Sequence, residues 1–146
     1  MNKIIDFSKA LAARVQSVTG YNVFHVPTEL TPQTDVYGYV LCNTFEYRLD
    51  FSSTGTQPVG GSIILYSPAL NNGLAGSQYG FEKLMDLADS RSDESLMKVL
   101  NDDRTVSGTC TGFLALSMQI QPLPDPDPEY STGTVWVVDI PFQAMV

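Results

Sequence analysis

The sequence predicts an α+β domain in which two helices pack on one face of a largely antiparallel sheet of four to five strands, with long loops. Two stretches repeat their apolar residues at the helical period, and several others alternate apolar with polar residues. The chain has 146 residues, a length that suits one domain, so we expect a single domain over residues 1–146. Apolar residues make up 43% of the chain and charged residues 16%, a composition that excludes a disordered acidic chain.

The first predicted element is an N-terminal helix. Its apolar residues recur at spacings of three and four: Ile4, Phe7, Leu11, Val15 and Val18. Asn2 can cap the start of this helix, and Gly20 can end it. A single apolar stripe with a polar back indicates that the helix packs on a sheet.

We expect a second helix near the middle of the chain, after a Gly- and Asn-rich loop at 71–76, with Ser77 as its N-cap. Its apolar stripe consists of Phe81, Leu84, Met85 and Ala88. A short helical continuation over 96–100 would be capped by a serine or aspartate of the segment 92–95. Acidic and basic residues are mixed along this region, which is typical of a solvated helix face.

Two strands are predicted before that helix, after a short extended piece at 22–26. The stretch 36–50 predicts one long strand, or two strands joined by a bulge near Asn43. Its alternating apolar residues predict one buried face, and they are Phe45, Tyr47, Leu49 and Phe51. A turn-rich segment at 52–61 then leads to a short apolar strand at 62–69, which we expect at the centre of the sheet.

The last third of the chain predicts two more strands. The apolar residues that alternate in the first of them are Leu114, Leu116, Met118 and Ile120. The final strand covers 134–142, where Pro141 is expected to place its end at an edge or a bulge. Between the two strands, the prolines of the segment 122–132 exclude a helix or a central strand, so we expect a projecting Pro/Asp-rich loop.

The sequence offers few candidates for catalysis or metal binding. His25 is the single histidine, which excludes His-rich zinc sites, and we expect it at a strand edge. Asp125, Asp127 and Glu129 could hold a hard cation such as Ca²⁺, but the prolines between them splay the carboxylates apart. The glycines of the segment 73–80 lack the spacing of a phosphate loop. Because no catalytic motif is recognised, we expect no enzymatic activity, no metal and no cofactor.

Charge and cysteine content narrow the functional classes further. A net charge of -8 and a pI near 4.3 disfavour binding to nucleic acid or to an anionic membrane. Cys42 and Cys110 are too far apart in the sequence for a CxxC unit, so we expect two reduced, half-buried thiols. No run approaches the roughly 18 apolar residues of a transmembrane helix, so we expect a soluble protein made in a reducing cytoplasm.

The order of these elements resembles that of a known family. The resemblance rests on an N-terminal helix (IIDFSKALAARV), the strands FEYRLDF and SIILYSPA, a central helix (GFEKLMDLADS), the stretch LALSMQIQ and the closing strand VWVVDIPFQAMV. In this layout the chain is similar to the tail-terminator and tail-completion (neck) proteins of long-tailed bacteriophages, which include minor capsid proteins of similar size.

This resemblance implies a non-enzymatic protein of the virion tail or neck. Members form homohexameric rings at the head-proximal end of the tail tube, where they end tube polymerisation and join the tail to the head. The implied partners are further copies of the chain, the tail-tube protein and the head–tail connector proteins, while DNA passes through the ring without specific binding. The loops at 122–130 and 71–76 depart from the family pattern and leave the position in the neck or tail open.

Candidate partner contacts lie mainly in two loops. The loop 122–130 is longer than a simple hairpin turn requires, and its candidate residues are Leu123, Asp125, Asp127, Glu129 and Tyr130. In the loop 28–35, Leu30 is the apolar residue that could dock on a neighbour. Trp136 is expected in the core or at a subunit interface.

Three other functions stay open at this level. The chain could be another phage structural subunit, such as a tail-tube or decoration protein, a small ligand-binding or host-directed inhibitor module, or an enzyme. A ring subunit should be oligomeric, whereas a ligand-binding module should be a monomer with one concave apolar pocket. An enzyme should show converging titratable groups with shifted pKa values.

Overall fold

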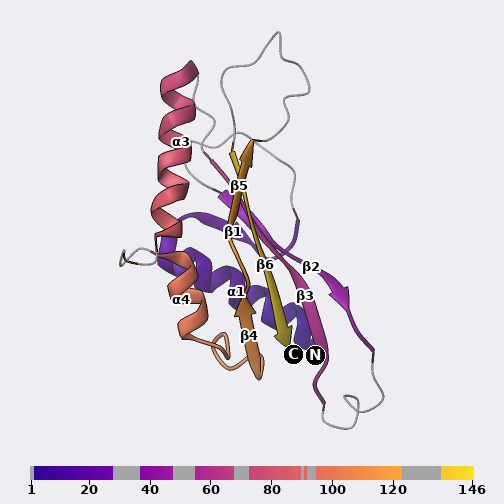
Figure 1. The fold of residues 1–146 in the computed structure, drawn as a ribbon. Coiled ribbons are helices and arrows are strands. Elements are labelled where there is room, and N and C mark those ends of the chain that lie inside the picture. The colour runs from indigo at the N-terminus through magenta and orange to yellow at the C-terminus, as the bar shows by residue number, and fades with distance from the viewer. Residues whose placement is uncertain are drawn as a thin grey trace.

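The computed structural model describes residues 2–27, 37–47, 55–67, 73–89, 91, 95–122 and 136–146, which form a mixed α+β fold (Figure 1). The elements are α1 (Lys3–Thr19), β1 (Asn22–Phe24), β2 (Tyr37–Phe45), β3 (Pro58–Tyr66), α3 (Gly73–Ala88), α4 (Leu96–Asp102), β4 (Gly112–Ala115), β5 (Gln119–Pro122) and β6 (Trp136–Met145). The α+β class and the largely antiparallel sheet are as predicted. The described part has three helices and six strands, rather than two helices and four to five strands.

The six strands form one twisted sheet in the order β1-β2-β3-β6-β4, and β5 also pairs with β6. All pairings are antiparallel except that of β1 with β2. The strands β4 and β5 lie end to end along the same edge of β6, at residues 142–145 and 136–139 respectively. Together they act as one edge strand with an interruption at 116–118.

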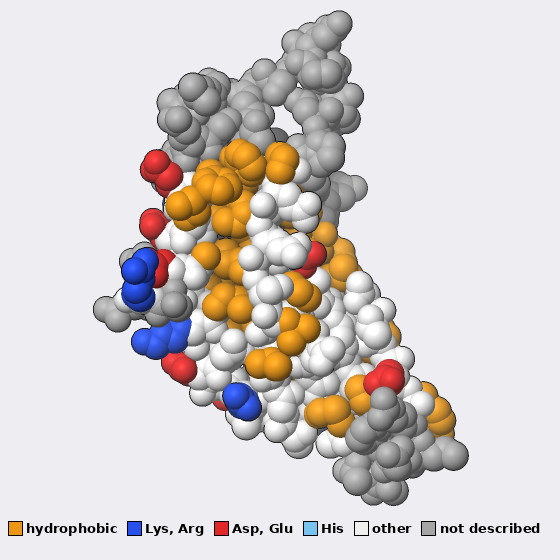
Figure 2. Space-filling model, in the orientation of Figure 1, with side chains coloured by type: hydrophobic (Ala, Val, Ile, Leu, Met, Phe, Trp, Pro, Cys, Tyr) orange, Lys and Arg blue, Asp and Glu red, His pale blue; other side chains and the backbone are white. Residues whose placement is uncertain are grey.

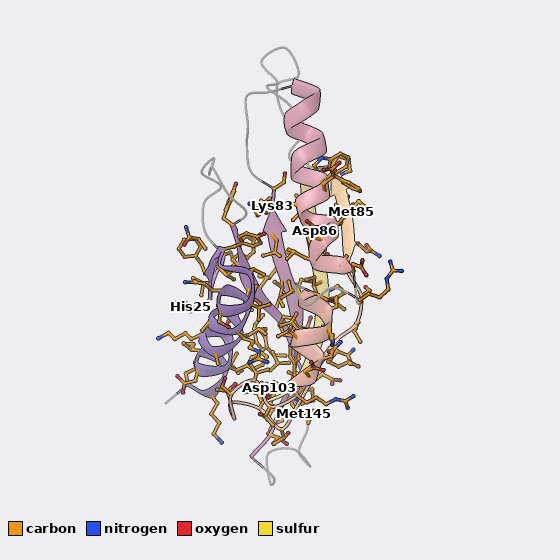
Figure 3. All side chains as sticks on the ribbon, turned by 90° about the vertical axis from the view of Figure 1, so that its left-hand side faces the viewer. His25, Lys83, Met85, Asp86, Asp103 and Met145 are labelled. Atoms are coloured by element: carbon orange, nitrogen blue, oxygen red, sulfur yellow. The ribbon has the colours of Figure 1, made fainter. Side chains whose placement is uncertain are left out.

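The described helices cover one face of this sheet. The core contains buried residues from α1, α3 and α4 together with the residues of one sheet face. The strand residues of that core include Val40, Ile63, Val138, Ile140 and Phe142. In Figure 3 α1 lies to one side of the strands and α3 and α4 are seen in front of them, and no helix of the described part of the chain lies beyond the strands on the other side.

The N-terminal helix is as predicted. The Asn2 side chain caps α1 by accepting hydrogen bonds from the amides of Ile4 and Ile5, both at 3.1 Å. Gly20 ends the helix in the left-handed region at φ 73°, which glycine adopts without steric cost.

Three phenylalanines join α1 to the C-terminal part of the sheet. The ring of Phe7 lies 5.9 Å from that of Phe142 and 6.3 Å from that of Phe113, and the latter two rings are 5.6 Å apart. All three are buried. Offset and edge-to-face aromatic pairs at these separations add to the stability from buried area, so this cluster ties the beginning of the chain to its end.

The middle of the chain departs from the predicted helix boundaries. The second helix, α3, begins at Gly73, so Ser77 lies inside it and is not its N-cap. The predicted continuation is a separate helix, α4, whose N-cap is Ser95. Packing of Leu84 and Leu96 into the common core stabilises both helices despite the glycines at the start of α3.

The sequence left open one long strand or two strands joined by a bulge near Asn43, and the structure has one strand with a bulge at this position. The register between β2 and β3 shifts between Cys42 and Thr44, which places the irregularity at Asn43. The strand ends at Phe45, however, and Phe45 and Tyr47 are 50% and 78% exposed. The predicted burial of these two residues is therefore wrong, because β2 has no described neighbour on its outer side at this end. The remaining residues of the predicted alternation, 49 and 51, lie outside the described part.

The central strand is also longer than predicted. β3 lies between β2 and β6 as expected, but it begins at Pro58 rather than at 62. Residues 58–61 have a turn-like composition, but they pair with β2 on one side and with β6 on the other, and these pairings stabilise them as part of the strand. Gly61 is needed here, because a methyl group at this position would collide with the carbonyl oxygen of Leu41 on β2.

The predicted orientation of β4 is wrong. Leu114 and Leu116 are predicted on the apolar face, but these residues are 43% and 49% exposed, whereas Phe113 and Ala115 are buried. After the interruption at 116–118 the even-numbered residues face the core instead of the odd-numbered ones, and Ile120 of β5 therefore packs against the core. A run of small and apolar residues is compatible with either orientation until a neighbouring strand selects one.

Pro141 lies inside β6 rather than at its end. Its carbonyl oxygen accepts a hydrogen bond from the Leu116 amide at 2.9 Å, so its nitrogen also points toward the β4–β5 edge. That edge is interrupted at 116–118, so the missing N–H of proline falls where the ladder is already broken.

We predict that Phe7→Ala lowers the free energy of unfolding by about 3–5 kcal/mol, because it leaves a cavity between two other buried rings. Urea unfolding followed by circular dichroism measures this. The matched control is Ile5→Ala on the same helix, where the side chain is 44% exposed and the loss should stay below about 1 kcal/mol. Equal losses for the two variants would contradict the assigned core.

Candidate interaction surface

The face of the sheet opposite the helices is the candidate site, and we call it the open face. Strand register assigns its residues, because side chains alternate between the two faces. Its outward-facing positions across the sheet include Tyr39, Leu41, Ile64, Tyr66, Val137, Asp139, Pro141, Gln143 and Leu114. No helix of the described residues packs on it.

The open face is apolar and almost free of charge. Asp139 is the single charged residue among the six strands, whereas every helix carries both signs of charge. In Figure 2, hydrophobic side chains run down this face and charged side chains gather along the side of α3 and α4. The cores of protein interfaces are depleted of charge in the same way.

Asp139 stands out within this apolar face. Its Oδ1 atom is buried and has no hydrogen-bond partner among the described residues. It lies in register with Ile64 on one side and Gln119 on the other. A buried acceptor without a donor costs free energy, so this atom would gain from a donor supplied by a partner.

Three tyrosines pack together at one end of the open face. The rings of Tyr37 and Tyr66 stack with centroids 5.3 Å apart, and the hydroxyls of Tyr39 and Tyr66 are 3.5 Å apart. Burial, and to a lesser extent the hydrogen bond and charge of Tyr39, raise the pKa of Tyr66. Burial likewise raises the pKa of Tyr37. Both phenols therefore stay neutral, and both side chains are already buried within the subunit.

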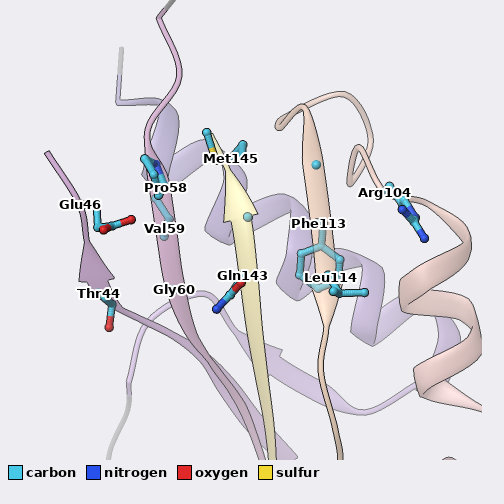
Figure 4. Close-up of a pocket in the computed structure, with 12 residues that line it drawn as sticks. Thr44, Glu46, Pro58, Val59, Gly60, Arg104, Phe113, Leu114, Gln143 and Met145 are labelled. Atoms are coloured by element: carbon cyan, nitrogen blue, oxygen red, sulfur yellow. The ribbon is translucent and has the colours of Figure 1, made fainter. Parts of the chain in front are cut away.

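A hollow of about 700 Å³ lies at the opposite end of the open face (Figure 4). Its floor is formed by neighbouring strands at Thr44, Gly60, Gln143 and Leu114. Gly60 has no side chain, so it leaves the space above its backbone free and the hollow is deeper at this point. Figure 4 shows Glu46 beyond β2 on one side of the hollow and Arg104 beyond β4 on the other.

A strained turn presents Arg104. Val106, Ser107 and Gly108 all have positive φ, at 45°, 58° and 79°, and such angles are unfavourable for a β-branched residue such as valine. The Asp103 carboxylate offsets this strain by accepting hydrogen bonds from the amides of Thr105 and Ser107 and from the Thr105 hydroxyl, at 2.9–3.1 Å. These bonds, that from Ser107 above all, lower the pKa of Asp103.

The two edges of the sheet differ beside this hollow. On the β4 edge, the side chain of Asn101 accepts from the Ala115 amide at 3.0 Å and donates to its carbonyl at 3.3 Å. It therefore occupies backbone groups that could otherwise pair with another strand. The outer edge of β2 beyond Tyr39 pairs with no described strand.

Of the residues predicted for partner contacts, only Trp136 belongs to the described part. It is half-buried, its ring packs on that of Phe81 with centroids 4.8 Å apart, and its amide donates to the Ser67 hydroxyl at 2.8 Å. Trp136 thus packs against the core, one of the two places expected for it. The other candidates lie outside the described residues: Leu30, Leu123, Asp125, Asp127, Glu129 and Tyr130.

Both cysteines are free thiols, as predicted, but only Cys42 is half-buried, whereas Cys110 is buried. Burial raises the pKa of Cys42, whose sulfur lies 3.7 Å from the Ser8 hydroxyl, and burial also raises the pKa of Cys110.

His25 follows β1, and its backbone carbonyl accepts a hydrogen bond from the Ser8 hydroxyl at 2.7 Å. Within the described ranges, no group of three or more His, Cys, Asp or Glu side chains could hold a metal ion.

Sequence reasoning missed the residues that frame the hollow. Arg104 was part of a mixed-charge region, and Leu114 was assigned to the core. The clearest available signal was Phe113, whose bulk favours the buried position next to Leu114. Glu46 belongs to the polar side of the predicted strand, which gives no indication that it lines the same hollow as Arg104.

No known protein family and no curated protein matches this sequence. Among the described residues, no helix is long and apolar enough to cross a membrane.

We predict that Asp103→Ala lowers the melting temperature at pH 7, because the strained turn loses three hydrogen bonds. The folded-state pKa of Asp103 is lowered, so its stabilising contribution is full above the ordinary carboxyl pKa of 3.8 and is lost as pH falls through the lower folded value. The difference from wild type should therefore shrink below about pH 4.

Thermal melts of both proteins from pH 7 to pH 2.5 test this. Asp102→Ala, at the neighbouring exposed position, is the control and should melt close to wild type at every pH. A melting difference that stays constant over this range would mean that the carboxylate does not hold the turn.

Proposed function

We propose that this chain is a non-enzymatic, self-assembling virion subunit of the tail-terminator kind. It forms a ring at the head-proximal end of a phage tail, ends tube polymerisation and joins the tail to the head. The observation that carries this proposal is the open face, an apolar and nearly uncharged sheet surface on a subunit whose described helices lie on the other side. Such surfaces mark protein–protein contacts.

Two further features support assembly with copies of the chain. A closed ring covers the edges of its subunits' sheets, which removes the open β2 edge as a site of uncontrolled pairing. The described residues carry nearly balanced charges, so most of the acidic excess of the chain lies in the other segments. Copies can therefore approach through the described surfaces without strong repulsion, while the acidic excess disfavours binding to DNA that passes through the ring.

Light scattering of the purified chain, with negative-stain images of the same peak, tests the proposal. We expect a ring, and we expect the ring to stop the growth of tail tubes when mixed with the tail-tube protein. A chain that stays monomeric at all concentrations and leaves tube lengths unchanged would contradict the proposal.

The hollow supports a second candidate function, that of a small ligand-binding module. Its volume of about 700 Å³ lies within the roughly 300–1,000 Å³ that ligand pockets occupy. A monomeric chain that is stabilised against heat by a small apolar compound would favour this alternative, and loss of that stabilisation in Gly60→Leu would locate the compound in the hollow.

A further inference from the structure

We infer that Asp139 prevents two copies of this chain from stacking on each other through their open faces. Its carboxylate thereby selects which surface of a second copy the open face can meet. The blocking role itself concerns one residue of the subunit, and only its consequence for a ring rests on the proposed function.

Largely apolar side chains surround Asp139 on the open face. Its neighbours are Val137 and Pro141 on the same strand, Ile64 in register on β3, and Tyr39 beside Ile64 on β2. All four are half-buried, so part of each side chain is still in contact with water. Without the carboxylate, two such faces could bury one another as the inner faces of a β-sandwich do.

Within the subunit, the carboxylate has no polar contact that accounts for its presence. Its Oδ1 atom is buried without a hydrogen-bond donor, and Asp139 forms no ion pair among the described residues. A buried acceptor without a donor costs the folded subunit free energy. A residue that breaks a rule of stability in this way indicates a role outside the subunit.

A face-to-face dimer would bury this carboxylate without compensation. The six strands of the described part contain no Lys or Arg, so those of a second copy offer Asp139 either neutral side chains or their own Asp139. A carboxylate that leaves water without a cation is strongly unfavourable, and two carboxylates that face each other repel. Asp139 therefore disfavours the contact that its apolar neighbours favour.

This exclusion decides what kind of assembly is possible. Contacts between identical surfaces close at two copies, whereas contacts between two different surfaces can continue into a ring. With face-to-face stacking disfavoured, the open face is left for a different surface of the next copy, which can bring the donor that Oδ1 lacks. The proposed ring requires a contact of this second kind.

Asp139→Leu tests the inference, because it replaces the carboxylate by an apolar side chain. We expect this variant to melt at a higher temperature than wild type and to form a closed dimer, at least about 10-fold tighter than any wild-type dimer in analytical ultracentrifugation. Asp139→Asn, which removes the charge and keeps the polarity, should fall between the two. The matched control is Asp86→Leu at an exposed position of α3, which should associate like wild type (Figure 3).

A double variant locates the new contact. Ser62 lies in register with Pro141 on the same face, so Ser62→Asp in the Asp139→Leu chain returns a carboxylate to the open face. This double variant should lose the dimer, and a dimer that persists in it would overturn the inference.

The remaining outcomes separate the inference from the proposed function. An Asp139→Leu chain that associates like wild type would overturn the inference and leave the ring untouched. A wild-type closed dimer that Asp139→Leu weakens would also overturn it, since Arg104 of the second copy would then be pairing with Asp139. A wild-type chain that stays monomeric while Asp139→Leu dimerises would support the inference and contradict the ring. Rings that Asp139→Leu converts into dimers would support both.

Discussion

The packing of α1 across the sheet through Phe7 is the contact on which the rest of the structure depends. Phe7 meets Phe113 of β4 and Phe142 of β6, so a helix at the start of the chain is fixed against its last strand. Because β6 is paired on both edges, this one cluster also positions β3 on one side and the β4–β5 edge on the other. Contacts between such distant parts of the chain hold a small domain together as a unit.

The described helices all pack on one side of the sheet, and none of them covers the other side. The strands form a continuous surface there, with stacked tyrosines at one end and a hollow at the other. The same strands carry almost no charge, so the open face differs chemically from the helical side as well as in shape. This difference between the two sides is the basis of the proposed assembly.

Local sequence patterns predicted the elements whose formation depends on neighbouring residues. The stripe and the two caps of α1 lie within a single stretch, and Asn2 and Gly20 act where expected. The bulge at Asn43 was also foreseen, since it interrupts an alternation that can be read along one strand. The α+β class followed from the same periodicities, whereas the number of helices and strands did not, because short elements such as α4 and β5 are stabilised by the core more than by their own sequences.

The sequence by itself determined the helical stripe of α1 with its two caps, and the free thiols. Tertiary structure alone decided which face of β4 is buried, since Leu114 and Phe113 are both apolar and only pairing with β6 selects between them. It also decided that Pro141 could lie inside a strand, because the gap between β4 and β5 falls opposite its nitrogen. The hollow between Glu46 and Arg104 depends on pairings among four strands, and no single stretch of sequence contains that information.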